Sequence, residues 1–106
     1  MPSPQTMEEL TNRVRHSVGE ESGLNAIVLF NLGDDGFIRI DGLSKPNRVS
    51  NDGTDPTITI SLSRENFQRI LDHDLSPQKA LITGKMRLKG DIRIAMRLNK
   101  VFGIDD

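Results

Sequence analysis

The stretch GKMRLKGDIRIAMRL, residues 84–98, contains a strand pattern followed directly by a helix pattern. In its first part, cationic and apolar side chains alternate, which predicts a strand from Lys85 to Lys89 with Met86 and Leu88 facing a core. Gly90 predicts a turn after that strand. The stretch therefore predicts a half-buried strand leading into a helix.

The helix pattern predicts the last helix of the chain, from Ile92 to about Phe102, with Asp91 as its N-terminal cap. This helix is apolar on nearly every side, because Ile92 and Met96 form a second edge beside its main stripe. Such a helix must be covered on more than one side or must border something apolar that is not protein. Two interpretations stay open: a helix that borders a cavity, and a well-packed core helix.

The upstream chain predicts a helix, a strand pair, a short edge strand, a further strand and two helices. Thr6 followed by Glu9 is the capping-box pattern, and Gly19 predicts the end of the first helix. Hairpins and short links favour an antiparallel or mixed sheet with the helices gathered on one face. The expected ranges are 6–18 for the first helix, 24–32 and 37–43 for the hairpin, 48–50 for the edge strand, 57–62 for the next strand, and 63–72 and 76–82 for the middle helices.

The composition is that of one compact domain over residues 1–106, with residues 1–5 expected to be disordered. Charged residues make up 27% of the chain and the net charge is -1, which argues against a general polyanion-binding role. The chain has no cysteine, so disulfides, thiolate nucleophiles and cysteine-based metal sites are excluded. With no signal-peptide pattern at the N-terminus, we expect a cytoplasmic protein.

No motif predicts catalysis, a metal site or a cofactor. His16 and His73 are isolated and are interpreted as solvated surface residues. The acidic stretches at 34–36 and 51–55 are fragments of calcium loops that lack the rest of the motif, so they are interpreted as turns. Gly84-Lys85 lacks the earlier glycine and the following Ser or Thr of a phosphate-binding loop.

Six cations gather where the last strand meets the last helix. They allow two interpretations: a solvated surface, or a weak patch for anionic head groups or for the phosphates of an acyl carrier. Nucleic acid is not an expected partner, because the chain has no Trp or Tyr and only four Phe to stack on bases. The cations are Lys85, Arg87, Lys89, Arg93, Arg97 and Lys100.

Four pieces of the second half of the chain occur in the order and spacing of a known family. They are Phe67, Leu75–Ala80, Gly84–Asp91 and Ala95–Leu98. In this combination the chain resembles the sterol carrier protein 2 (SCP-2) family. The N-terminal half agrees with that family only in the pattern and order of its elements.

The resemblance implies an α/β fold of the α+β type, in which a five-stranded, mostly antiparallel sheet and helices packed on one face enclose an apolar tunnel. It also implies that Phe67, Ile92 and Met96 line this tunnel and that Asp91 caps the last helix. The full set of predicted ligand-binding residues is Phe30, Ile38, Ile40, Phe67, Leu71, Leu81, Met86, Leu88, Ile92, Met96 and Phe102.

Members of the SCP-2 family are carriers or binding modules rather than enzymes. The resemblance therefore implies a non-catalytic lipid-binding or transfer protein whose ligand is a fatty acid, an acyl-CoA or a sterol. The alternative is an interaction or dimerisation module that serves a lipid- or quinone-metabolising enzyme. We expect a monomer or weak dimer that makes transient contact with anionic membrane surfaces.

Overall fold

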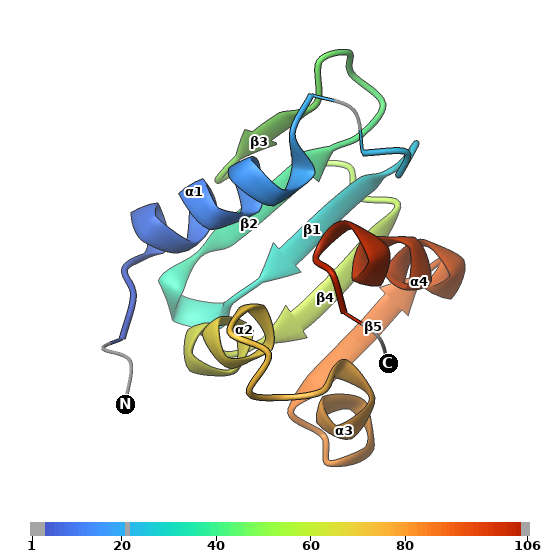
Figure 1. Ribbon diagram of the computed structural model, residues 1–106. Coiled ribbons are helices and arrows are strands. Elements are labelled where there is room, and N and C mark those ends of the chain that lie inside the picture. The colour runs from blue at the N-terminus through green and yellow to red at the C-terminus, as the bar shows by residue number, and fades with distance from the viewer. Residues whose placement is uncertain (1–3, 21, 105–106) are drawn as a thin grey trace.

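The structure, a computed structural model, describes residues 4–20 and 22–104, and these residues fold into one five-stranded sheet and four α-helices (Figure 1). Most of the segment predicted to be disordered, residues 1–3, lies outside the described residues. The elements are α1 (Met7–Val18), β1 (Ile27–Asn31), a short 3₁₀ turn (Gly33–Asp35), β2 (Phe37–Asp41), β3 (Arg48–Ser50), β4 (Ile58–Leu62), α2 (Arg64–Leu71), α3 (Pro77–Ile82), β5 (Met86–Gly90) and α4 (Ile92–Val101).

Helix α1 begins at the predicted capping box. The Thr6 Oγ1 accepts a hydrogen bond from the Glu9 backbone N–H at 3.1 Å, and the Glu9 carboxylate accepts one from the Thr6 backbone N–H at 3.1 Å. These two bonds satisfy backbone donors that the first helical turn leaves unpaired. The apolar stripe of α1, which is Leu10, Val14 and Val18, is buried against the sheet.

Strand β1 is shorter than the range 24–32 that the sequence predicts. Asn25 adopts a left-handed backbone conformation with φ of 50°, which Asn tolerates better than most residues but which a strand cannot contain. The chain therefore enters the sheet only at Ile27. Leu24 and Ala26 are nevertheless buried, so this segment is part of the core without being part of the sheet.

The strand order is β3-β2-β1-β4-β5. Strands β1 and β4 are parallel, and the other three neighbouring pairs are antiparallel. The mixed, mostly antiparallel sheet that the sequence predicts is thereby confirmed. The order also places β2 and β3 on one side of β1, and β4 and β5 on the other.

Helices α1 and α4 lie on the same face of the sheet but at different places along it. Figure 1 shows α1 beside β2 and β3, and α4 beside β4 and β5. Because side chains alternate along a strand, Phe30, Ile38 and Ile60 meet on this face through their pairing in register. The core lies between this face and the helices.

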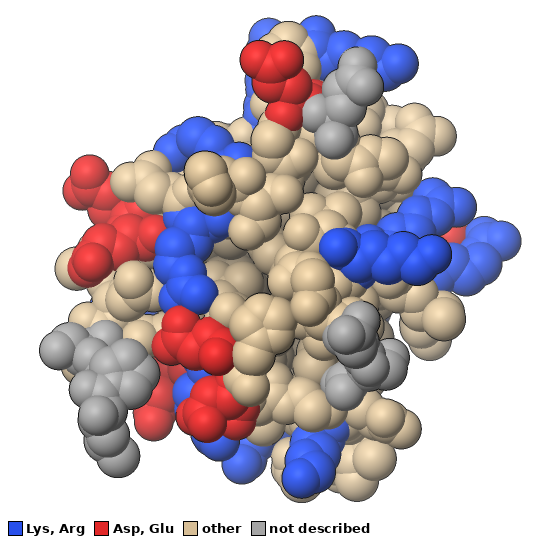
Figure 2. All heavy atoms as spheres, in the orientation of Figure 1, with Lys and Arg blue, Asp and Glu red and all other residues tan. Residues whose placement is uncertain are grey.

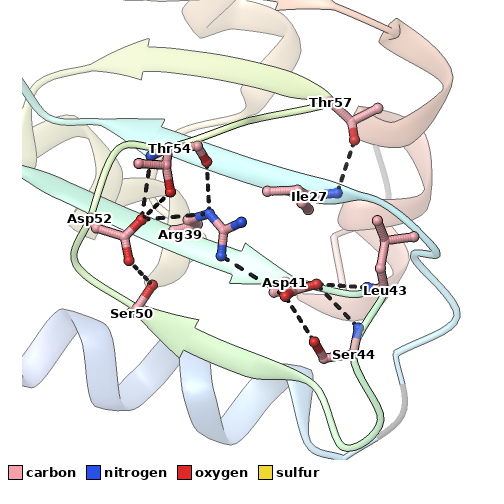
Figure 3. A network of polar contacts seen from close by, with 9 residues as sticks. All are labelled: Ile27, Arg39, Asp41, Leu43, Ser44, Ser50, Asp52, Thr54 and Thr57. Atoms are coloured by element: carbon pink, nitrogen blue, oxygen red, sulfur yellow. Dashed lines mark hydrogen bonds and ion pairs between the residues drawn. The ribbon is translucent and has the colours of Figure 1, made fainter.

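The opposite face of β2 is covered by the loop between β3 and β4 (Figure 3). The Arg39 Nε donates a hydrogen bond to the Thr54 carbonyl at 2.8 Å and lies 3.7 Å from the Asp52 carboxylate. Hydrogen bonds from the Thr54 and Ser50 hydroxyls, together with the nearby Arg39, lower the pKa of Asp52. This polar network holds the loop against the sheet.

Candidate functional site

An open cavity of about 300 Å³ lies between α2, α3, α4 and the half of the sheet formed by β1, β4 and β5. Its lining is apolar apart from two neutral amide side chains, Gln78 and Asn99. A pocket of this size and lining is typical of sites that bury apolar small molecules. The floor comes from the strands and the walls from the helices.

The strand pairing assembles the floor. Ile60 pairs with Phe30 on one side and with Leu88 on the other, and Leu62 pairs with Met86. All five side chains line the cavity. The register therefore turns separate alternating patterns in β1, β4 and β5 into one continuous apolar surface.

Three aromatic rings in the lining of the cavity contact one another. The ring centroids of Phe30 and Phe67 are 4.6 Å apart with the planes tilted by 43°, and those of Phe30 and Phe102 are 6.3 Å apart. Tilted pairs at these separations are favourable contacts between rings. Phe30 thus joins α2 to the end of α4 through the floor of the cavity.

Gly90 and Asp91 fix the start of α4 above the sheet. Gly90 has φ of 124°, and a Cβ at this position would lie 2.5 Å from the Thr57 carbonyl oxygen, so only glycine lets β5 end so close to β4. The Asp91 carboxylate then accepts a hydrogen bond from the Arg93 backbone N–H at 3.1 Å, which caps the helix as predicted. The Arg93 side chain also binds Asp91, and these hydrogen bonds lower the pKa of that carboxyl.

Helix α4 presents two different apolar edges. Ile94 and Leu98 are buried, whereas Ile92 is 62% exposed and Met96 is 69% exposed although both line the cavity. The cavity is therefore open to the surface along the edge of α4 that carries Ile92 and Met96. On the other side of the opening, α3 contributes Leu81.

The structure brings nine of the eleven predicted ligand-binding residues together around this cavity. Ile38 and Ile40 do not line it. Both are fully buried on β2, on the side of β1 that faces α1, so the distance along the sheet removes them from the cavity. The nine residues at the cavity are Phe30, Phe67, Leu71, Leu81, Met86, Leu88, Ile92, Met96 and Phe102.

Several lining residues were not predicted from the sequence. Strict alternation in β4 already indicated that Ile60 and Leu62 face a core, and Asn99 lies one helical turn beyond Met96, so helix and strand periodicity could have found these three. Ile104, by contrast, follows α4 and carries no pattern. The other lining residues that were missed are Ile70, Pro77, Gln78, Ala95 and Leu98.

Among the described residues, the side chains that line the cavity include no His, Asp, Glu, Lys or Arg. Across residues 4–20 and 22–104, no group of three or more His, Asp or Glu side chains is placed to hold a metal ion. His16 and His73 are exposed and do not line the cavity. What the arrangement can do chemically is to remove an apolar group from water.

Comparisons with known proteins agree with this geometry. The model of the SCP-2 sterol transfer family matches residues 7–103. The chain belongs to the SCP-2 sterol transfer family. No match is found among curated proteins. No helix in the described part of the chain is long and apolar enough to cross a membrane.

Solved structures with the same fold include carriers and a protein of quinone synthesis. Sterol carrier protein 2 from Yarrowia lipolytica, in its apo form, is 22% identical with a TM-score of 0.69, over 91% of this chain and 78% of that one. Palmitated SCP2L2 from Aedes aegypti is 21% identical with a TM-score of 0.67, over 92% and 95%. The UbiJ-SCP2 ubiquinone synthesis protein is 10% identical with a TM-score of 0.57, over 94% and 82%.

Proposed function

We propose that this chain is a non-catalytic lipid-binding and transfer protein that holds the apolar part of a lipid in the cavity beneath α4. The observation that carries the proposal is the open edge of α4, where Ile92 and Met96 line an apolar cavity and are exposed at the same time. A packed core helix would bury such side chains, so their exposure is poorly explained without a ligand.

The dimensions of the cavity favour a fatty acyl chain as the ligand. Its volume of about 300 Å³ is at the lower end of the range for small-molecule pockets, which suits a narrow flexible chain better than a bulky rigid ring system. The flexible side chains of Met86 and Met96 can adapt to such a chain. A palmitated form of the Aedes aegypti neighbour supports the same ligand class.

The head group of the ligand would lie at the opening rather than in the depth of the cavity. Gln78 and Asn99 supply the polar atoms of the lining, and both are neutral. A carboxylate or phosphate enclosed among the phenylalanine rings would lose its hydration without a charged partner, which is unfavourable. The exposed cations of α4 outside the cavity are better placed to meet an anionic head group.

Native mass spectrometry of freshly purified protein tests the proposal. We expect part of the protein to carry the mass of one lipid, and we expect addition of palmitate to convert the rest to a 1:1 complex. At about 100 times its dissociation constant, a ligand stabilises the fold by about 2.7 kcal/mol, which raises the melting temperature by on the order of 10 °C. If fatty acids, acyl-CoAs and sterols all leave both the mass and the melting temperature unchanged, the proposal fails.

The second candidate is an interaction module for an enzyme of lipid or quinone metabolism. The UbiJ-SCP2 ubiquinone synthesis protein, which shares the fold, supports this reading. The same mass spectra separate the two functions, because a carrier gives a lipid adduct whereas an interaction module gives a dimer or a partner protein. Cytoplasmic location is part of both readings and stays a prediction.

A further inference from the structure

The edge of the sheet at β5 is cationic on the face away from the cavity. Met86 and Leu88 line the cavity, and side chains alternate along a strand, so Arg87 and Lys89 point to the opposite face. Both are exposed, as is Lys85 directly before the strand. We call these three cations, Lys85, Arg87 and Lys89, the β5 row.

No acidic side chain in the described part of the chain pairs with the β5 row. None of its three members forms an ion pair there. Residues 75–90, which contain the row, include no Asp or Glu. The β4 residues paired with the row are Ser61 and Thr59, which are uncharged. Asp91, the next acidic residue along the chain, is already bound by Arg93.

The cations of α4 differ from the β5 row in this respect. Figure 2, seen from the side of the helices, shows basic side chains gathered over α4 and acidic ones over α1 and α2. Arg93 binds the Asp91 carboxylate, and Arg97 donates a hydrogen bond to the Leu24 carbonyl at 3.3 Å. Two of the three cations of α4 thus have partners within the chain. The β5 row is the basic surface that has most to gain from a partner outside the chain.

Strand β5 also has a backbone edge that no other strand occupies. It is the last strand in the sheet order, and among the described residues it pairs with β4 alone. Such an edge presents backbone N–H and C=O groups that can pair with another extended segment. With five residues, β5 offers a longer edge than β3, which has three residues at the other end of the sheet.

We propose that β5 binds an extended acidic segment of a partner protein, which adds to the sheet as a sixth strand. Carboxylates at alternate positions of this segment would lie opposite Arg87 and Lys89, because paired strands share the same spacing of alternate side chains. Backbone hydrogen bonds would supply the affinity, and the charge pairs would select the partner and its register. The proposal does not depend on lipid binding, because neither cation lines the cavity.

A second copy of the chain is a poor occupant of the same edge. Antiparallel pairing of two β5 strands would bring the cations of both copies close together, and like charges opposite each other destabilise a strand pair. The other edge strand, β3, begins with the exposed cation Arg48. The β5 row therefore disfavours both edges of a second copy and favours a strand of opposite charge.

Binding of synthetic peptides to the full chain, measured by fluorescence anisotropy, tests the proposal. The probe is a short peptide in which Glu alternates with Thr and Val. The control peptide has the same composition with its Glu residues adjacent. We expect the alternating peptide to bind several-fold more tightly, and we expect added salt to weaken its binding. Equal affinity for the two peptides, or binding of neither, would overturn the proposal.

Backbone N-methylation distinguishes strand addition from simple attraction between charges. One version of the alternating peptide is N-methylated at its Glu residues, and the other version at the residues between them. Successive N–H groups of a strand point to opposite edges, so only one version loses the donors that face β5. We expect that version to lose binding and the other to keep most of it. Equal affinities of the two versions would contradict strand addition.

Two charge-reversal variants localise the contact. Arg87→Glu/Lys89→Glu should weaken binding of the alternating peptide by at least about tenfold, since two attractive cross-strand pairs become repulsive. Lys45→Glu/Arg48→Glu makes the same change of net charge beside the other edge of the sheet and should keep most of the affinity. All four side chains are exposed, and thermal melts verify that both variants fold. Equal losses in the two variants would show that net charge alone matters.

Palmitate binding separates this proposal from the proposed function. Arg87→Glu/Lys89→Glu should leave palmitate affinity unchanged, because neither residue lines the cavity. If palmitate binds and the alternating peptide does not, strand addition fails and the lipid-binding proposal stands; the opposite result reverses this. A dimer, or binding to phosphatidylserine vesicles in place of the peptide, that the same substitution abolishes would contradict an acidic strand as the occupant.

Discussion

The two ends of the sheet differ in how completely the apolar side chains of their helices are buried. On the β2 side, the stripe of α1 is fully used in packing, and Leu10 and Val14 lie against a face that includes the buried Ile38 and Ile40. On the β5 side, α4 packs with one edge and leaves a second apolar edge at an open cavity. We call the β2 side of the sheet, where α1 is fully packed, the closed end. We call the β5 side, where the cavity lies, the open end.

This difference shows that a helix with more apolar surface than the surrounding protein can cover indicates a binding site. Helix α1 has one narrow apolar stripe and meets one sheet face. Helix α4 has a broader apolar surface, but α3 on the far side of the opening is only six residues long. The cavity exists because α4 has more apolar surface than its neighbours can bury.

The largest expected effect is on stability, at the closed end. Ile38→Ala removes a fully buried side chain and leaves a void, so it should lower the free energy of unfolding by about 2–5 kcal/mol. Urea denaturation measures this loss. Palmitate affinity of the folded protein should stay the same, because Ile38 does not line the cavity. A variant of normal stability that has lost palmitate binding would place Ile38 in the site after all.

The next effect is on ligand binding, at the open end. Met96→Asp puts a charge on the cavity wall and should weaken palmitate binding by at least about tenfold, with little change in stability because Met96 is largely exposed. Ile82→Asp is the matched control, since Ile82 is also largely exposed but lies outside the lining. Fluorescent fatty-acid displacement in solution measures both. Retained affinity in a folded Met96→Asp variant would move the site elsewhere.

The smallest effect is on acid stability, again at the closed end. Asp41 is the last residue of β2, and a hydrogen bond from the Ser44 hydroxyl at 2.8 Å is the main cause of its lowered pKa (Figure 3). A carboxyl whose pKa is lower in the folded state than in the unfolded state stabilises the fold at pH values above its unfolded-state pKa. This stabilisation disappears as the pH falls through its folded-state pKa.

Asp41→Asn should therefore lower stability by less than about 1 kcal/mol at neutral pH, and this deficit should shrink as the pH falls through the lowered pKa of Asp41, below which the wild-type carboxyl is protonated. Denaturation midpoints across a series of acidic pH values measure the difference. A variant whose deficit grows on acidification would contradict the assigned cause.

Local elements could be predicted from the sequence because their signals are local. The Thr6–Glu9 capping box, the Ser63 and Ser76 caps and the alternation in β4 all lie where expected, and each depends on residues a few positions apart. The aromatic and aliphatic lining of the cavity was mostly predictable from the same periodicity once the family resemblance indicated a site.

The placement of β2 could not be predicted in this way. Ile38 and Ile40 alternate just as Ile58 and Ile60 do, so the pattern shows that both pairs face the core but not which helix they meet. That assignment depends on the parallel pairing of β1 with β4, which joins residues about 30 positions apart and places β2 on the far side of β1. The opening of the cavity beside α4 likewise depends on how far α3 and α4 are separated.

Methyl NMR during a palmitate titration tests directly whether a lipid binds beneath α4. With the methyl groups of Ile, Leu and Met labelled, we expect the signals of Leu71, Leu88, Ile92 and Met96 to shift and to saturate at one equivalent of palmitate, while those of Ile38 and Ile40 stay unchanged. Shifts centred on Ile38, Ile40 and the α1 residues, or no saturable shifts at all, would contradict the claim that α4 and the adjoining half of the sheet hold a lipid.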